Sequence, residues 1–379
     1  AGFKGKIVST EPTREMAELI MLDSMGLLGK EALHAGVPML YEEKDVFETM
    51  HLWDEVVEYE KTFTLKTDDE DAIITFHDAG HILGSATIEI AYKGKKIVFT
   101  GDLGNTPSPL MRDTTPLKDV DYLIIESVYG DRNHKDKDKR IEIFKEAVVS
   151  TIKKGGTVLI PAFSIERTQE ILLAFNELVE SKQIPEIPVY LDSPLGINIT
   201  KIYKKHEHWF NENIEKILKG GDDIFAFKGL VSTPSPDESK AIKEDHRPKV
   251  IIAGSGMSNG GRIVHHEAKY LSDPNSTIII AGYQAVNTLG RRIVDEDKEV
   301  YIHGQPVPLR ARVVNIHGFS AHKDSEHLIE FVDSTKDTLK RVFVVLGEPK
   351  STYFLGQRLH ETYGVPVTVP ERGDVVELD

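Results

Sequence analysis

The sequence contains no cysteine, which excludes disulfide bonds and every metal site built on thiolates. Any transition metal must therefore be held by histidine, aspartate or glutamate. Basic charge is also scarce, since 46 lysine and arginine residues stand against 61 aspartate and glutamate residues, for a net charge of −15. Taken alone, this acidity disfavours a nucleic-acid partner. It does not exclude one, because a bound metal adds local positive charge.

Long apolar runs are absent too, so no segment is expected to span a bilayer and no membrane partner is expected. The opening residues AGFKGKIVSTEP lack the apolar core of a secretory leader. A cytoplasmic location is therefore the expectation. The 379 residues suffice for two domains, each with a core of its own.

The order of apolar segments divides the chain into three parts. Residues 1–130 are rich in strands, and the segment 131–310 alternates strands with helices, as is typical of a parallel sheet. Residues 311–379 are too few to fold alone and are expected to complete the first part. The expected helices are 12–23, 139–153, 165–182, 195–218, 261–271, 324–334 and 350–363, and residues 42–58 are expected to begin as a helix and continue as an extended segment. The expected strands include 71–76, 96–100, 121–126, 157–163, 187–192, 249–255, 276–283, 310–316 and 341–347, with two short strands at the end.

Two of these strands run into turns of small residues that each carry one metal-capable side chain. Residues 71–76 lead to His81, and residues 96–100 lead to Asp102. Glycine and alanine beside them allow sharp bends and the close approach of a ligand. An imidazole and a carboxylate together suit zinc or manganese. By itself, a histidine beside glycine is more often an ordinary loop residue, so the rest of the pattern must decide.

Further motifs follow the same form of strand and functional turn. They are Glu126 in IIESVYGDRNH, His322 in HGFSAHKD, and in the middle segment IPAFSIERTQEIL, LDSPL, GSGMSNGG and GYQ. With HDAGHILGSA and GDLGN, their order and spacing resemble the β-CASP branch of the metallo-β-lactamase superfamily, in particular its RNA-processing members such as ribonuclease J. The resemblance covers the whole sequence. It implies an αββα metallo-β-lactamase sandwich, incomplete at its N-terminus, with an inserted α/β/α β-CASP domain built on a parallel sheet.

The resemblance also implies roles for single residues. His81 and Asp102 are the implied metal ligands, and Asp102 bridges two zinc ions in the family. Asp102, Glu126 and His322 are the implied catalytic residues, with Glu126 orienting His322 and His322 acting on the leaving oxygen. General chemistry agrees, because histidine donates protons near neutral pH and a carboxylate partner fixes its tautomer.

Substrate contacts are implied within the inserted segment and beside it. Glycines 254–261 are suited to cradle a phosphate, although a tight strand-to-helix turn is the alternative. Arg167 is suited to clamp a phosphate or is ion-paired, and Tyr283 stacks on a base or lies in the core. The implied substrate-binding residues are Ser164, Arg167, Ser255, Gly256, Tyr283, Gln284 and Ser320.

Two departures from the family pattern bear on the metal. The His-X-His-X-Asp-His motif that supplies most ligands is absent, and it would precede the first residues of this sequence. Leu346 stands where the family has the histidine of its motif C. Leucine cannot bind a metal, so the two zinc ions of the family are expected to be held weakly or in part.

Two further histidine pairs are candidates for metal ligands, and the first of them is a candidate substitute for the absent motif. His206 and His208 lack a following Asp-His and are expected to be an exposed pair on a helix. His265 and His266 are neighbours on a helix and face different ways, so a structural or nucleotide-contacting role fits them better than metal binding.

The function favoured by the resemblance is a metal-dependent hydrolase of RNA phosphodiesters in RNA processing or decay. Endonucleolytic cleavage is favoured and 5′ exonuclease activity is kept open, with single-stranded RNA lying between the two domains. The alternative is a non-catalytic scaffold that binds RNA or protein partners. Leu346 favours the scaffold, whereas the intact His81, Asp102, Glu126 and His322 oppose it. A homodimer is kept open.

Overall fold

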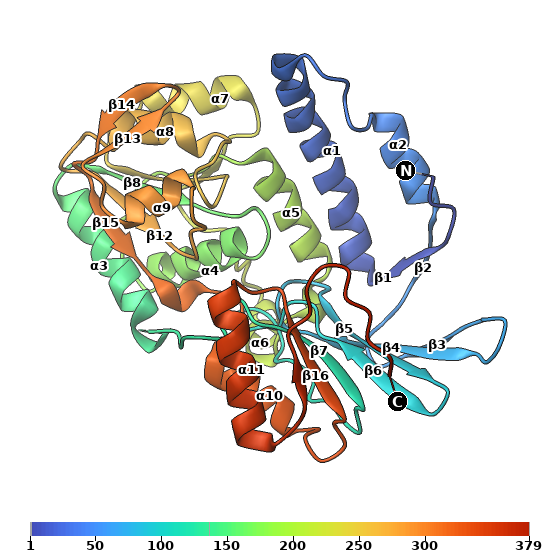
Figure 1. Ribbon diagram of the computed structural model, residues 1–379. Coiled ribbons are helices and arrows are strands. Elements are labelled where there is room, and N and C mark those ends of the chain that lie inside the picture. The colour runs from blue at the N-terminus through green and yellow to red at the C-terminus, as the bar shows by residue number, and fades with distance from the viewer. Residues whose placement is uncertain (1, 136, 379) are drawn as a thin grey trace. The chain divides into compact units, whose positions relative to one another are not determined.

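The computed structural model describes residues 2–135 and 137–378, which form two compact units (Figure 1). The first unit comprises residues 2–133, 209–211 and 321–378, and the second comprises the other described residues between 134 and 320. Within the described residues, none of the helices combines the length and apolar character that a membrane crossing requires.

The first unit is built on a seven-stranded mixed sheet with the order β17-β16-β7-β6-β5-β4-β3. Neighbours from β3 to β6 are antiparallel, and those from β6 to β17 are parallel. A separate parallel pair joins β1 (Ile7–Ser9) to β2 (Trp53–Val56). The strands of the large sheet are β3 (Thr62–Leu65), β4 (Ala72–Asp78), β5 (Ala86–Tyr92), β6 (Lys95–Phe99), β7 (Tyr122–Glu126), β16 (Arg341–Val345) and β17 (Val367–Thr368).

Two helices cover β7 and β16 on one face, as Figure 1 shows. Helix α10 (Ser325–Asp333) begins where the Asp324 side chain accepts a hydrogen bond from the His327 N–H, and α11 (Pro349–Tyr363) begins with proline and ends at Gly364 in the left-handed conformation. Their apolar residues join those of the strands in one buried core. The other helices of this unit are α1 (Glu11–Ala35) and α2 (Glu43–His51).

The second unit holds a six-stranded sheet whose neighbours are all parallel, in the order β10-β9-β11-β8-β12-β15. The strands are β8 (Thr157–Pro161), β9 (Val189–Leu191), β10 (Leu230–Ser232), β11 (Lys249–Ala253), β12 (Thr277–Ile280) and β15 (Arg312–Asn315). The helices are α3 (Arg140–Lys153), α4 (Arg167–Glu180), α5 (Pro194–Lys205), α6 (Glu212–Lys219), α7 (Pro236–Ala241), α8 (Ile263–Tyr270) and α9 (Leu289–Val294).

Several boundaries differ from the sequence prediction. The strand expected at 310–316 in the closing part is β15, which instead pairs with β12 in the sheet of the second unit. The helix expected at 12–23 continues to Ala35, whereas the segment 42–58 is a helix to His51 and then the strand β2, as expected. Only one of the two expected terminal strands, β17, is present in the described residues. A hairpin of β13 (Glu299–Ile302) and β14 (Gln305–Pro308) was not predicted.

The long helix expected at 195–218 is broken into α5, a single 3-10 turn and α6. The break follows from Trp209 and Phe210, which are buried and belong to the first unit. There the Trp209 ring packs edge-on against Tyr59 at 4.5 Å between ring centroids, and Phe210 pairs with Met111. Burying two aromatic side chains outweighs the local preference for a continuous helix.

Candidate active site

His81 lies in a tight turn that follows β4. Gly80 has a φ of +66°, and a β-carbon there would lie 2.7 Å from the Arg112 carbonyl oxygen, so a larger residue does not fit. The backbone N–H of His81 donates to the Ser85 hydroxyl at 3.1 Å. The turn therefore fixes the backbone from which the imidazole projects.

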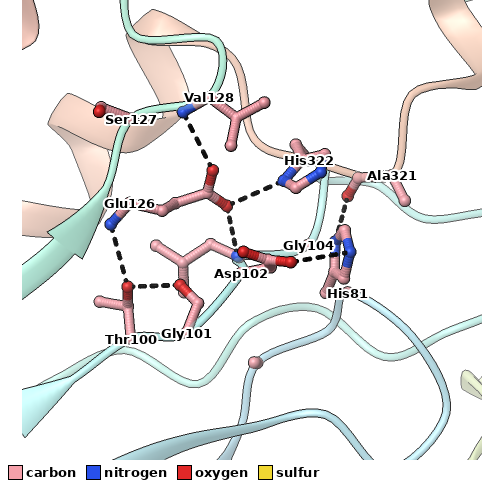
Figure 2. A network of polar contacts seen from close by, with 12 residues as sticks. His81, Thr100, Gly101, Asp102, Gly104, Glu126, Ser127, Val128, Ala321 and His322 are labelled. Atoms are coloured by element: carbon pink, nitrogen blue, oxygen red, sulfur yellow. Dashed lines mark hydrogen bonds and ion pairs between the residues drawn. The ribbon is translucent and has the colours of Figure 1, made fainter. Parts of the chain in front are cut away.

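Asp102 lies in a second turn, after β6, which touches the first turn through glycine. A β-carbon on Gly104 would lie 1.9 Å from the carbonyl oxygen of Gly80, and the Gly104 N–H donates to the Ala79 carbonyl at 2.8 Å. Only glycine permits this approach. As a result His81 Nε2 lies 3.7 Å from Asp102 Oδ2 (Figure 2).

The other ring nitrogen of His81 faces the backbone. Its Nδ1 lies 3.3 Å from the carbonyl oxygen of Ala321, which can only accept a hydrogen bond. In a neutral ring that donates from Nδ1 to this carbonyl, Nε2 carries the lone pair, on the side of Asp102. A histidine oriented in this way by a carbonyl is the usual arrangement of a metal ligand.

Glu126 ends β7 and is completely buried. Its Oε1 accepts a hydrogen bond from the Leu103 N–H at 2.6 Å and lies 3.2 Å from His322 Nδ1, while Oε2 accepts from the Val128 N–H at 3.3 Å (Figure 2). The carboxylate therefore holds the Asp102 turn and the His322 ring in one network. It also directs the Nδ1 proton of His322 toward itself.

His322 is brought in from the far end of the sequence by a short β-bridge to Gly104. Its ring centroid lies 4.4 Å from that of His81. The four side chains at positions 81, 102, 126 and 322 thus lie together, as the sequence predicts. Their chemical roles remain predictions.

Donor atoms of His81, Asp102 and His322 all lie within 4.8 Å of one another. Two imidazoles and one carboxylate are ligands that zinc accepts, and a set this compact fits a divalent transition ion. The sequence predicted His81 and Asp102 as ligands, whereas the structure adds His322 to the same donor group. Three donors leave coordination positions open, which is the property of catalytic rather than structural zinc sites.

Leu346 follows β16 directly, and β16 pairs with β7 so that Val345 lies opposite Glu126. The leucine is 64% exposed and has a φ of +58°. Gly347 packs on Ser127, whose hydroxyl donates to the Val345 carbonyl at 2.8 Å. Position 346 therefore stands at the end of the strand beside Glu126, without a metal-binding side chain.

The serines predicted to bind substrate lie at the carboxyl ends of the strands in the second unit. Ser164 follows β8, and its hydroxyl lies 3.4 Å from that of Ser193, which caps α5. Ser255 follows β11, and its hydroxyl accepts a hydrogen bond from the Asn259 N–H at 3.1 Å. Both Ser164 and Ser255 are partly exposed.

The other residues predicted to bind substrate are buried or half-buried within the second unit. Arg167 is buried and ion-paired with Glu170, which is the alternative that the sequence left open for it. Gln284 is buried, and its amide donates to the carbonyl of Gly256, itself buried, at 3.0 Å. Ser320 is buried, and Tyr283 is half-buried.

The histidine pairs behave differently from each other. His206 is 2% exposed, so the prediction of an exposed pair with His208 is wrong for this residue. His206 directly follows α5, at the break in the expected long helix, and its side chain lies in the interior. His265 is exposed and His266 buried, as expected for neighbours on a helix.

A buried carboxylate that the sequence did not single out connects the motifs of the second unit. Asp192 accepts hydrogen bonds from Thr233 at 2.8 Å, Ser239 at 2.6 Å and Arg262 at 2.7 Å, and His266 Nε2 lies 2.7 Å away. These hydrogen-bond donors outweigh burial and lower the pKa of Asp192 to about 2. The only signal in the sequence was its place in the LDSPL motif.

Family comparisons match both units. The family described as the Beta-Casp domain matches residues 168–293. The family described as the Zn-dependent metallo-hydrolase RNA specificity domain matches residues 306–370. Together they cover the parallel strands of the second unit apart from β8, and the segment that carries His322.

Similar proteins extend over nearly the whole chain. A protein named Ribonuclease TTHA0252 from Thermus thermophilus is 32% identical over 94% of this chain and 79% of its own length. An RNase J-like protein from Methanocaldococcus jannaschii is 32% identical over 98% of this chain and 83% of its own length. A transcription termination factor FttA from Methanosarcina mazei is 31% identical over 95% of this chain, which spans 57% of that longer protein. The chain belongs to the β-CASP branch of the metallo-β-lactamase superfamily.

Proposed function

We propose that this protein hydrolyses phosphodiester bonds in single-stranded RNA, with internal cleavage as its main mode and 5′ exonuclease action as the second. The observation that carries the proposal is the contact between Glu126 and His322, 3.2 Å long, beside the donor atoms of His81 and Asp102. A buried carboxylate that orients a histidine next to a metal-type donor group suits phosphoryl chemistry.

In this proposal His322 donates a proton to the oxygen that leaves the phosphorus. Expelling an alkoxide near neutral pH requires such a donor, and imidazolium is suited to that task. Glu126 accepts a hydrogen bond from the protonated Nδ1 of His322. The other ring nitrogen, Nε2, is therefore the one that donates a proton to the substrate. Because Glu126 also accepts the Leu103 N–H at 2.6 Å, its carboxylate cannot rotate away without breaking that bond.

His81 and Asp102 would hold the metal, and zinc is the ion proposed. The ion would supply Lewis-acid stabilisation of the charge that develops on the phosphate. His81 Nε2 and Asp102 Oδ2, which lie 3.7 Å apart, are ligand types that suit such an ion, and Nε2 of His322 is left for the substrate. Weak or partial occupancy is proposed because position 346 contributes no ligand.

Ser164 and Ser255 are proposed to contact the sugar–phosphate backbone of the RNA. Both lie at the carboxyl ends of strands in a parallel sheet, where ligands of such sheets bind. Arg167 is not included, because its guanidinium is engaged with Glu170 inside the unit. Homodimer formation and a cytoplasmic location remain predictions, and sedimentation velocity would test the first.

A second candidate is a scaffold that binds RNA without cutting it. The exposed Leu346 at the place of a family ligand favours it. The intact network of Glu126 with Leu103 and His322 opposes it, because a binding surface has no need of an oriented proton donor.

The two candidates are separated by incubating end-labelled single-stranded RNA, and the same RNA as a duplex, with the protein as its gene encodes it. Zinc is supplied in one arm and a chelator in the other. The hydrolase cuts the single strand at internal positions, spares the duplex, and stops when the metal is chelated. RNA that is bound but left intact at every zinc concentration supports the scaffold.

A further inference from the structure

Strands β8 and β11 are neighbours in the parallel sheet of the second unit, but the chain leaves them in opposite directions. From β8 it crosses to β9 on one side, and from β11 it crosses to β12 on the other. Since such crossovers are right-handed, the two connections lie on opposite faces of the sheet. A crevice forms at the carboxyl ends of two strands related in this way, and it is where open parallel sheets bind ligands.

Phe163 lies at the carboxyl end of β8, two residues beyond Pro161, and it is 45% exposed. Its backbone is fixed, because its carbonyl accepts hydrogen bonds from the Thr168 hydroxyl at 2.7 Å and the Thr168 N–H at 3.2 Å. Its ring is also fixed on one side by Gly256 in the turn after β11. A β-carbon on Gly256 would lie 2.7–2.9 Å from three ring atoms. A rigid aromatic ring thus remains open on its other side.

Polar groups follow Phe163 in the sequence and lie near Gly254 in the turn after β11. The hydroxyls of Ser164 and Ser193 are 3.4 Å apart, and a β-carbon on Gly254 would lie 3.9 Å and 3.8 Å from them. The bare backbone at Gly254 leaves room beside the partly exposed Ser164 hydroxyl, whereas Ser193 is buried and its hydroxyl accepts the Gly196 N–H at 3.1 Å. Neutral hydroxyls beside an aromatic face are suited to a nucleotide, whose base is flat and whose sugar and phosphate are polar.

Positively charged side chains do not provide the attraction for a nucleic acid at this part of the second unit. The arginines of the neighbouring segments are engaged within the unit, since Arg167 pairs with Glu170 and Arg262 with Asp192. The sequence as a whole carries a net charge of −15. Stacking is the contact with a nucleic acid that works without positive charge, because every base has an aromatic face.

We propose that Phe163 stacks on one unpaired base of the RNA, with the Ser164 hydroxyl contacting the adjoining sugar and phosphate. This inference rests on the proposed function and adds a subsite to it. Because the base must leave its own stack to reach the ring, the subsite selects single strands over duplexes. It discriminates little between base types, because every base has an aromatic face that can stack on the ring.

Equilibrium binding of fluorescein-labelled single-stranded RNA, with a chelator present to prevent cleavage, tests the subsite. Phe163→Ala is expected to weaken binding by about 5- to 150-fold, the effect of losing one stacked base, whereas Phe163→Trp preserves it. Tyr301→Ala is the matched control, because Tyr301 is an exposed aromatic residue of the same unit, on β13, and is expected to bind as the unsubstituted protein does.

A second measurement uses RNAs in which a single position lacks its base. The unsubstituted protein should lose affinity when one particular position is abasic, and Phe163→Ala should be indifferent to it. If Phe163→Ala binds as tightly as the Tyr301→Ala control while the unsubstituted protein still cleaves RNA, the subsite is rejected and the hydrolase function stands. If the unsubstituted protein neither binds nor cleaves RNA, both are rejected.

Discussion

Nδ1 of His322 lies 3.2 Å from Oε1 of Glu126, although 196 residues separate them in the sequence. The same Oε1 accepts the N–H of Leu103, next to Asp102. One buried carboxylate oxygen therefore links the turn that carries a metal-type ligand to the ring proposed as proton donor. Orientation of the ring depends on an acceptor at this position.

Replacing Glu126 by glutamine keeps the shape of the side chain but replaces one oxygen by a hydrogen-bond donor. If the amide nitrogen faces His322, the ring is driven into the other tautomer. We expect Glu126→Gln to lower RNA turnover by about 10- to 100-fold, as for other carboxylates that orient a functional histidine. Turnover under saturating RNA, with circular dichroism to verify folding, checks this. Equal turnover in both proteins would show that the contact has no catalytic importance.

The contact of the two turns at Gly104 is predicted to tolerate no side chain. Gly104→Ala places a β-carbon 1.9 Å from the Gly80 carbonyl oxygen, so the turns carrying His81 and Asp102 must separate. We expect loss of zinc binding together with destabilisation of about 1–3 kcal/mol.

Gly26→Ala is the matched control for this substitution, because Gly26 lies within α1 with open space around its Cα. It should raise stability by about 0.5–1 kcal/mol, since alanine favours helix more than glycine does. Urea unfolding and zinc titration are measured for both variants. Unchanged zinc affinity in Gly104→Ala would contradict the close contact.

Leu346→His restores a ligand type at the end of β16. Leu346 is 64% exposed and has a φ of +58°, a backbone conformation in which histidine is more frequent than leucine. We expect the variant to fold normally and to bind zinc more tightly, by about tenfold or more, as measured by competition with a chromogenic chelator. Leu346→Gln has a similar polarity but no imidazole and serves as control. Equal zinc affinity in the two variants would mean that position 346 does not face the metal.

Glu267 is fully buried in α8, and burial raises its pKa to about 8 although Ser258 donates to it at 2.5 Å. The folded protein therefore keeps this proton where the unfolded chain, with an ordinary carboxyl pKa, has lost it. The free energy of unfolding must therefore fall as pH rises from the ordinary carboxyl pKa to about 8, and it levels off above pH 8.

Glu267→Gln has no proton to lose, so its stability relative to the unsubstituted protein should grow by about 1.4 kcal/mol per pH unit between pH 5 and 8. Urea unfolding across this range measures the difference. Glu142→Gln, at an exposed position of α3, should show no such trend. Parallel stability curves for the unsubstituted protein and Glu267→Gln would show that Glu267 is ionised when folded.

The sequence predicts the parts of the site that depend on local pattern. Strands that end in small-residue turns place His81 and Asp102, and the ordered motifs add Glu126 and His322. Alternation of strands with helices predicts the parallel sheet of the second unit. The strand, turn and helix signals are each contained in a few neighbouring residues, whereas Glu126 and His322 were identified by the resemblance to a family.

Features that depend on distant partners were missed. The break of the helix at His206 is caused by Trp209 and Phe210 packing with residues of the first unit, which no local pattern reveals. Asp192 gathers its donors from separate segments of the chain, among them Thr233 and His266. Pairing of β15 with β12 likewise depends on the whole sheet. Tertiary contacts of this kind override local propensity.

The most direct test of the proposed mechanism is single-turnover cleavage of single-stranded RNA by His322→Ala. Single-turnover conditions separate the chemical step from product release. His51→Ala, at an exposed position of α2, is the control, and RNA affinity and zinc content are measured for both variants. We predict that His322→Ala cleaves about 10²- to 10⁴-fold more slowly than the control while binding RNA equally well. Cleavage at the rate of the control would contradict the role of His322 as proton donor.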